Sequence, residues 1–428
     1  MPFLVPDDDD DEQSDSDDLL MEMIEEDERM VVTALSSMWL SFSNTILVLV
    51  HFCFKAIFRQ ACPSIQQPRL DWEDFCHFQR ADFHRHMRMT REDFNLLLDL
   101  TMEPLSTEMV RTDGHIPIPP VIKLYCAIRW LAGGSYLDIK ANAGVSKTSF
   151  YRAVWEAINA INGCKELELK FPQTEDECFE CAKDFCNISY GDAIINCVSV
   201  ADGYAVEIET PPGHVVGNVR SFFSGHKQKN CVNVQACCDA FCRFQYVAVA
   251  GPGSLNDRDA LVACDLGRLV DNLPLNYVMI FDAAYPSSKH GVPMYFGVDK
   301  ENPFCDNFNY YASQLRIRIE MAFGMMYQKW GVLWRPMRVS IDNVKCVVQA
   351  IARLHTFVIN QRLKREGYQD FSQRIQGTER FQPPDDNREQ REYNESIENM
   401  VLGPTGISFI RTRMAERVQE LGLTRPPK

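Results

Sequence analysis

Apolar runs separated by turn-forming residues dominate the chain between about residues 194 and 282. The runs INCVSVAD and YAVEIET predict one pair of strands, and CVNVQACCD and RFQYVAVAG predict a second pair with its turn at residues 240–242. The segment GPGSLNDRDALVACDLGRLV is typical of a turn that leads into a helix. The run NYVMIFD then predicts one more short, buried strand.

Helical periodicity replaces this pattern from residue 312 onward. Apolar side chains recur at the spacing of one helix face in residues 312–330, at Leu315, Ile319, Phe323 and Met326. The pattern DNVKCVVQAIARLHTFVINQRLK predicts a second strong helix. Three strands, a further strand after a helix, and then two helices predict an α/β layer with a mixed sheet flanked by helices.

The part of the chain before these strands has helical periodicity only. A helix is expected after Thr90, and PIPPVIKLYCAIRWLAGG predicts another, with prolines at its start and glycines at its end. In SYLDIKANAGVSKTSFYRAVWEAINAI, a short helix ends at Gly144 and Ser146 caps a second helix. A helix, a glycine turn and a helix in this order are typical of a helix–turn–helix.

Polar side chains at the start of that second helix are candidates for DNA contacts, because a helix–turn–helix binds DNA there. They are Lys147, Thr148, Ser149 and Arg152. A plain helical bundle with a solvated polar face is equally compatible with these residues, so the pattern leaves both interpretations open.

Charge separates the N-terminal end from the rest of the chain. The net charge is −15, and residues 1–30, which include DDDDDEQSDSDD, hold 14 acidic groups and one arginine. Like charges at this density predict a disordered tail. The remaining chain is close to neutral, which neither favours nor excludes nucleic acid as a partner.

An apolar segment follows the acidic tail. Residues 40–58 are long enough to span a membrane, but polar side chains interrupt them, so membrane contact is the minor interpretation beside a helix packed on the folded body. The whole pattern divides the chain into an acidic tail (1–30), an apolar segment and linker (31–83), a helical DNA-binding domain (84–165), an α/β domain (190–365) and a polar C-terminal tail (366–428).

Three carboxylates stand out in the α/β domain. Asp202 closes the run VSVAD, Asp282 closes YVMIFD, and Glu320 lies inside the helix expected over residues 312–330. Two strand-end aspartates and a helix glutamate can hold two divalent ions about 4 Å apart, which suits phosphodiester cleavage. Mg²⁺ and Mn²⁺ are the expected cofactors because hard cations prefer carboxylate oxygen.

Each acid also has a structural explanation. A strand-end aspartate is a common turn residue, and Arg316 stands four residues before Glu320, at the spacing of a helix ion pair. Gly324, one turn after Glu320, is expected to leave open space beside that carboxylate. Asp257 and Asp259, which follow the GPGS turn, are alternative metal ligands.

Basic side chains near the acids are candidates for holding a phosphate backbone. They are Lys227 and Lys229 in SGHKQKN, Arg316 and Arg318 in the expected helix, and Lys329, Arg335 and Arg338 beyond it. Taken singly, each is better explained as a solvated surface charge.

These motifs follow the order found in a known family. VSVADG resembles the first-aspartate motif of DDE transposases of the PIF/Harbinger type and of the Harbinger-derived nucleases. NVQACCDAFCRFQYVAVAGPGSLNDRDAL is similar to their strand–turn–strand segment, FDAAYP to their second-aspartate motif, and RIRIEMAFGMM to their third-acid motif. ARLHTF is similar to a motif near the end of such domains, so the resemblance covers roughly residues 194–363.

The resemblance implies an RNase H-like fold with Asp202, Asp282 and Glu320 as the metal-binding triad, and a helix–turn–helix upstream of it. The expected function is metal-dependent cleavage of double-stranded DNA, followed by strand transfer in a working transposase. The alternative is a domesticated, non-catalytic DNA-binding protein. A nuclear location, a Myb-like accessory protein and a homo-oligomer are further expectations.

The sequence departs from the family pattern at four positions. Ala205 and Asn256 stand where the family often has His, Phe281 stands where Gly commonly precedes the second aspartate, and Thr356 replaces an expected Asn. None of the four is a member of the implied triad.

Overall fold

The computed structural model describes residues 68–106, 117–297, 301–367 and 409–426. The predictions for the acidic tail and for residues 40–58 lie outside these residues. Within the described ranges, no helix combines the length and the apolar character that a membrane span requires.

The first part of the described chain is helical. Its helices are α3 (Trp72–Phe78), α4 (Phe83–Met87), α5 (Arg91–Ser106), α6 (Pro120–Leu131), α7 (Tyr136–Ala143) and α8 (Lys147–Gly163). The predicted turn between α7 and α8 is confirmed: Gly144 has a left-handed conformation, and the Ser146 hydroxyl accepts the Ser149 N–H at 3.2 Å. Both α7 and α8 pack on α6.

This helical region begins earlier than predicted, because residues 72–87 form α3 and α4 instead of continuing a linker to residue 83. Asp71 starts α3 by accepting the N–H groups of Glu73 and Asp74. Trp72 stacks on Phe94 with ring centroids 4.8 Å apart. Helices of five and seven residues are too short to show a periodic pattern, so aromatic packing, not periodicity, sets this boundary.

A mixed sheet follows. The elements that lead to it are η1 (Lys165–Leu167), α9 (Glu175–Ile188) and η2 (Tyr190–Asp192); its strands are β1 (Cys197–Glu207), β2 (Phe223–Ser224), β3 (Lys229–Cys238), β4 (Phe244–Pro252), β5 (Val278–Phe281) and β6 (Gly291–Pro293). The strand order is β2-β3-β1-β5-β6, and β4 pairs with β3. β1 runs antiparallel to β3 and parallel to β5. The predicted β3–β4 hairpin is confirmed.

The prediction that residues 195–202 and 204–210 form two paired strands is wrong. Residues 197–207 form the single strand β1, which continues through Gly203 and pairs with β3 from Val200 to Glu207. Gly203 follows an acid at the end of an apolar run, which is the usual pattern of a turn. Here it is an extended residue in the middle of a strand, opposite Gln235.

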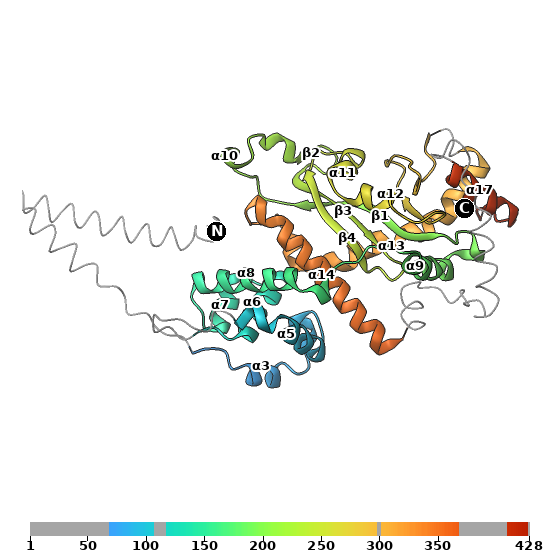
Figure 1. The fold of residues 1–428 in the computed structure, drawn as a ribbon. Coiled ribbons are helices and arrows are strands. Elements are labelled where there is room, and N and C mark those ends of the chain that lie inside the picture. Colours follow the sequence, from blue (N-terminus) through green and yellow to red (C-terminus); the bar gives the residue numbers. More distant parts are fainter. Residues whose placement is uncertain (1–67, 107–116, 298–300, 368–408, 427–428) are drawn as a thin grey trace, which may run out of the picture. The chain divides into compact units, whose positions relative to one another are not determined.

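Helices cover both faces of the sheet (Figure 1). One face packs on α13 (Pro303–Lys329), η5 (Gly331–Trp334) and α14 (Ile341–Glu366), which confirms the two predicted helices. The other face packs on α9, α11 (Asp257–Ala263) and α12 (Leu266–Asp271), around a core that includes Val198, Cys237 and Met279. The short elements α10 (Gly213–Val216) and η3 (Val219–Phe222) lead from β1 to β2.

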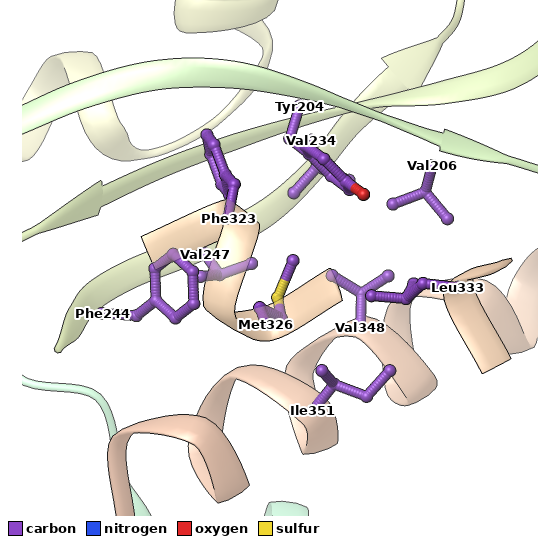
Figure 2. A pocket seen from close by; sticks show the side chains of 10 residues that line it. All are labelled: Tyr204, Val206, Val234, Phe244, Val247, Phe323, Met326, Leu333, Val348 and Ile351. Atoms are coloured by element: carbon purple, nitrogen blue, oxygen red, sulfur yellow. The ribbon is translucent and has the colours of Figure 1, made fainter. Parts of the chain in front are cut away.

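The layer between the sheet and α13 and α14 is apolar (Figure 2). It surrounds a small cavity lined by Tyr204, Val206, Val234, Phe244, Val247, Phe323, Met326, Leu333, Val348 and Ile351. These side chains come from β1, β3, β4, α13, η5 and α14, so this layer fixes α13 against the strands that carry the candidate acids.

The helical region contacts the α/β region through α14 and η5. The helix α8 packs on α14, and Asn162 and Arg353 donate hydrogen bonds across this contact to the carbonyl groups of Cys346 and Cys164. Gly133 and Gly331 meet backbone to backbone, since a Cβ on Gly133 would lie 2.9 Å from Gly331. Only glycine permits this approach at a φ of +90°.

The sequence predicts a polar tail over residues 366–428, but its last part forms a helix. This helix, α17 (Phe409–Glu420), packs on α13 and β6. Ile410, Met414 and Val418 are buried on its inner face. Arg425 pairs with Asp306 at 2.8 Å, so the chain after residue 408 belongs to the folded body rather than to a tail.

Candidate active site

The two predicted aspartates lie on neighbouring parallel strands. The β1–β5 register pairs Val200 with Ile280. Asp202 and Asp282 each come two residues after this pair, so they lie at equivalent positions along the two neighbouring chains. Adjacent strands are about 4.8 Å apart, and side chains of equal register stand next to each other. Asp282 follows the end of β5 directly, as predicted, whereas Asp202 lies within β1 rather than at its end.

A third aspartate approaches the same place from α11. A Cβ on Gly203 would lie 2.7 Å from a carboxylate oxygen of Asp257, 3.1 Å from the Gln235 amide nitrogen and 3.5 Å from the Tyr285 hydroxyl. The side chain of Asp257 therefore fills the space that Gly203 leaves open. Asp259, the other alternative ligand, instead exchanges hydrogen bonds with Asn256 at the start of α11, so only Asp257 joins the site.

Glu320 is connected to Asp202 by one guanidinium group. Arg316 donates to Asp202 Oδ2 at 3.0 Å with one terminal nitrogen and to Glu320 Oε1 with the other. The expected helix ion pair between Arg316 and Glu320 is therefore present, and it also includes the first strand acid. Gly324 has open space around it, as predicted, and Glu320 is exposed beside it.

The site is rich in negative charge. Burial raises the pKa of Asp202 to about 6, and the carboxylates of Asp282 and Asp257 add to this rise. The Gly203 N–H, which donates to Asp202 at 2.8 Å, and the Arg316 guanidinium both oppose it. Burial and Asp282 also raise the pKa of Asp257, although hydrogen bonds from Asn233 and Gln235 limit the effect. Arg316 thus compensates only part of the clustered charge.

The donor chemistry fits a hard divalent cation. All four candidate ligands are carboxylates, and their mutual repulsion is the kind of charge that Mg²⁺ or Mn²⁺ relieves. In the part of the chain that the structure describes, however, no three His, Cys, Asp or Glu side chains lie close enough together to hold a metal ion. The Arg316 guanidinium lies between Asp202 and Glu320. A metal ion bound by both carboxylates would have to displace this guanidinium or bind beside it.

The predicted phosphate-binding residues divide into two groups. Lys227 is exposed and lies near Asp257, whose pKa it lowers, and Lys229 is exposed and pairs with Glu207 at 2.6 Å. Arg318 is only 5% exposed and lies beside Cys238 and Cys242, so the prediction that it contacts DNA is wrong. It stands two residues after Arg316, and that spacing turns it to the inner face of α13.

The candidate DNA contacts of the helical region remain near its surface. Thr148 is exposed, and Lys147 lies over the Tyr136 ring with its ammonium 5.6 Å from the centroid. Arg152 pairs with Glu156 at 3.6 Å. Glu156 also forms an ion pair with the buried Lys123 ammonium at 2.6 Å. Glu156 therefore neutralises part of the charge of Arg152 within the helical region.

Sequence reasoning missed a buried polar network behind the acids. The Tyr285 hydroxyl donates to Gln235 Oε1 at 2.7 Å, and the Gln235 amide donates to Asn233 at 2.8 Å. These groups hold Asp257 in place through the hydrogen bonds that Asn233 and Gln235 make with it. A signal was available: Asn233 and Gln235 are alternate polar residues in an otherwise apolar strand, CVNVQACC.

Three of the four residues that depart from the pattern of the resembled family have structural roles. Asn256 caps α11 by accepting the Asp259 N–H at 2.9 Å, and Phe281 packs on Tyr285 with ring centroids 4.9 Å apart. Thr356 accepts the Phe244 N–H at 3.0 Å, and so ties α14 to β4. These contacts stabilise the elements around the site and leave Asp202, Asp282 and Glu320 in place.

Comparison with known proteins finds a similarity in the stretch that carries these acids. Residues 201–356 match a family model described as DDE superfamily endonuclease, which begins just before Asp202 and includes Asp282 and Glu320. No curated protein and no solved structure matches the chain significantly. The stretch that carries the three acids is thus similar to DDE superfamily endonucleases.

Proposed function

We propose that this protein is a divalent-metal-dependent DNA endonuclease or transposase whose metal-binding carboxylates are Asp202, Asp282 and Glu320. One observation carries the proposal: Asp202 and Asp282 stand at the same register of parallel neighbours, and Arg316 joins Asp202 to Glu320. The similarity of residues 201–356 to DDE superfamily endonucleases supports the assignment.

A divalent cation held by these carboxylates, with Asp257 as a further ligand, would activate a water or a 3′-hydroxyl and stabilise the leaving oxygen. The residues of the chain prepare that binding. Asp202 must lose its proton, and Arg316 must loosen its hold on Asp202 and Glu320. A guanidinium released in this way stays beside the site, where it can bind a phosphate oxygen in two-point contact.

The finer parts of the proposal concern the subtype and the partners. We assign the α/β region to an RNase H-like fold of the PIF/Harbinger type, supported by the mixed sheet and by the order of the motifs across residues 194–363. Helices α7 and α8 would act as a helix–turn–helix on double-stranded DNA, supported by the exposed start of α8. A nuclear location, a Myb-like accessory protein and a homo-oligomer complete this proposal.

Cleavage of a supercoiled plasmid with Mn²⁺ or Mg²⁺ tests the proposed function. The parent should nick the plasmid, and Asp282→Asn should lower the rate at least about 100-fold, because losing a metal ligand removes several kcal/mol of transition-state stabilisation. Asp259→Asn is the matched control, since it removes an exposed carboxylate two residues from Asp257.

Two outcomes would count against the proposal. Equal nicking by the parent and by Asp282→Asn would place the activity elsewhere or in a contaminant. No nicking by a parent that still binds DNA would favour the domesticated, non-catalytic DNA-binding protein. If Asp257→Asn but not Asp259→Asn lowers cleavage, Asp257 belongs to the metal-binding set.

A further inference from the structure

The outer face of α13 continues past Glu320 as an exposed ridge. Helical spacing places Gly324 and Tyr327 on the same side as Glu320, and all three are exposed. Two helical turns separate Glu320 from Tyr327, a rise of about 10 Å. A Cβ on Gly324 would meet no atom within 4 Å, so the ridge is low and open between them.

Two aromatic side chains lie at the far end of this ridge. Tyr327 is 42% exposed, and Trp334, the last residue of η5, is 50% exposed. The Trp334 indole N–H donates to the Tyr327 carbonyl oxygen at 2.7 Å, which holds the indole against the end of α13. An exposed aromatic pair with a fixed position is a surface that flat partners can cover.

The layer beneath the ridge gives this pair a rigid base. Phe323 and Met326 come from the same turns of α13 and face the apolar layer, where they pack with Leu333 (Figure 2). Tyr204 stacks on Phe323 with ring centroids 4.8 Å apart. Because the aromatic pair stands on packed core rather than on a loop, little ordering is needed when a ligand binds.

Cations lie beside the same surface. Lys229, the first residue of β3, lies near Tyr327, and Arg335 and Arg338 follow η5; all three are exposed, and Arg338 pairs with Glu209 at 3.4 Å. Lys229 pairs with Glu207, which raises its pKa, and the nearby Tyr327 phenol adds to this effect. Cations that follow phosphates, next to rings that stack on bases, are the composition of surfaces that bind single-stranded nucleic acid.

We propose that Tyr327 and Trp334 form a stacking platform for unpaired DNA bases beside the phosphate that the carboxylates would cleave. The inference rests on the proposed function and specifies its substrate: DNA with a frayed or single-stranded end. Bases inside an intact duplex are already stacked and must be unstacked before they can cover an external ring. The ridge of about 10 Å corresponds to about three stacked nucleotides at 3.4 Å each.

Binding of three fluorescein-labelled DNAs in Ca²⁺ tests the platform without cleavage. The probes are a blunt duplex, the same duplex with an unpaired thymidine tail, and the same duplex with an abasic tail of equal length. The parent should bind the thymidine tail about tenfold tighter than the abasic tail, since stacking needs bases whereas charge contacts need only phosphates. Tyr327→Ala and Trp334→Ala should remove most of that preference.

The controls separate stacking from folding and from charge. Tyr327→Phe keeps a ring and should keep the preference, and Phe78→Ala removes an 80% exposed aromatic from α3 and should change nothing. Equal binding of both tails by the parent would overturn the platform, as would an equal loss on both tails in Tyr327→Ala. A tail preference in a parent that never nicks plasmid would keep the platform and refute the nuclease.

Discussion

The candidate active site and the helical region balance charge in opposite ways. At the site, the carboxylates of Asp202, Asp257 and Asp282 share their surroundings with fewer cations, Arg316 and the exposed Lys227. In the helical region and its contact with α14, cations outnumber carboxylates. Glu156 forms ion pairs with both Lys123 and Arg152, and Asp93 forms an ion pair with Arg365, close to Lys329.

This difference separates a binding role from a structural one. Burial raises the pKa of Asp202 to about 6, so the fold carries a carboxylate that costs stability when it is ionised. Asp93 is 3% exposed and is held by Arg365, so it joins α5 to α14. A protein gains nothing in stability from crowded, undercompensated carboxylates, whereas the proposed divalent cation would supply the missing positive charge.

The largest expected contrast comes from two glycines. Gly203→Ala places a methyl group within 2.7 Å of the Asp257 carboxylate, so it should displace that side chain, lower cleavage by about tenfold or more and cost about 1–3 kcal/mol of stability. In Gly163→Ala, at the end of α8, the new methyl group meets no atom within 4 Å. This variant should cleave like the parent, and its free energy of unfolding should stay within a few tenths of a kcal/mol of the parent's or rise slightly. Plasmid nicking and urea unfolding measure the two effects.

Equal cleavage rates and equal unfolding free energies in the two glycine variants would contradict the contrast between the site and the helical region. If Gly203→Ala cleaves and unfolds like the parent, then Asp257 is free to move and takes no part in the site. Such a result would reduce the candidate site to Asp202, Asp282, Arg316 and Glu320.

The pH dependence of cleavage should respond to Arg316 but not to Arg152. A carboxyl group that keeps its proton is a poor metal ligand, so activity should fall as the pH drops through about 6, the pKa of Asp202. Arg316 lowers that pKa, and Arg316→Ala should therefore move the acidic limb to higher pH. Cleavage rates measured from pH 5 to 9 test this shift, with Arg152→Ala as the control. An acidic limb at the same pH in Arg316→Ala and in the parent would contradict the expectation.

Replacement by asparagine should change the free energy of unfolding in opposite directions at the half-buried Asp202 and at the buried Asp93. The folded pKa of Asp202 lies above its unfolded value, so ionisation above about pH 6 costs stability, and Asp202→Asn should stabilise the metal-free protein at pH 7.5 by on the order of 1–3 kcal/mol. Asp93→Asn should destabilise it by about 1–3 kcal/mol, because Arg365 loses its partner. Urea unfolding in EDTA measures both, and two changes of equal sign would contradict the distinction.

The smallest expected effect concerns DNA affinity. Lys227→Ala removes an exposed cation near Asp257 and should weaken duplex binding several-fold, with a slope of affinity against salt that is smaller by about one. Arg152→Ala should change affinity less, because Glu156 already takes part of that charge. Anisotropy titrations over a range of salt compare the two variants, and a larger loss in Arg152→Ala would move the main DNA contact to α8.

The acids were accessible from the sequence because buried strands have a simple pattern. Each of these two aspartates closes an apolar run, and the structure places Asp202 within β1 and Asp282 directly after β5. Helical spacing assigns Glu320 to the outer face of α13. The continuity of β1 through Gly203 was not accessible, since an acid followed by glycine is also the pattern of a turn. Tertiary contacts with Asp257, Gln235 and Tyr285 are what require glycine there.

Charged side chains on one helix were harder to assign. Arg316 and Arg318 have the same local sequence context, yet one joins the carboxylates and the other is buried beside Cys242. Which arginine faces the sheet depends on the rotation of α13, and the apolar layer around Phe323 sets that rotation. The start of the helical region at Trp72 likewise depends on aromatic contacts between helices rather than on local pattern.

Calorimetric titration with Mn²⁺ tests the central claim most directly, because it needs no DNA substrate and no partner. The parent and Asp259→Asn should bind Mn²⁺ with the same affinity, whereas Asp202→Asn should lose most of it. Binding should also weaken below about pH 6, where Asp202 takes up a proton. No Mn²⁺ binding by the parent, or equal binding by the parent and Asp202→Asn, would contradict a metal site at these carboxylates.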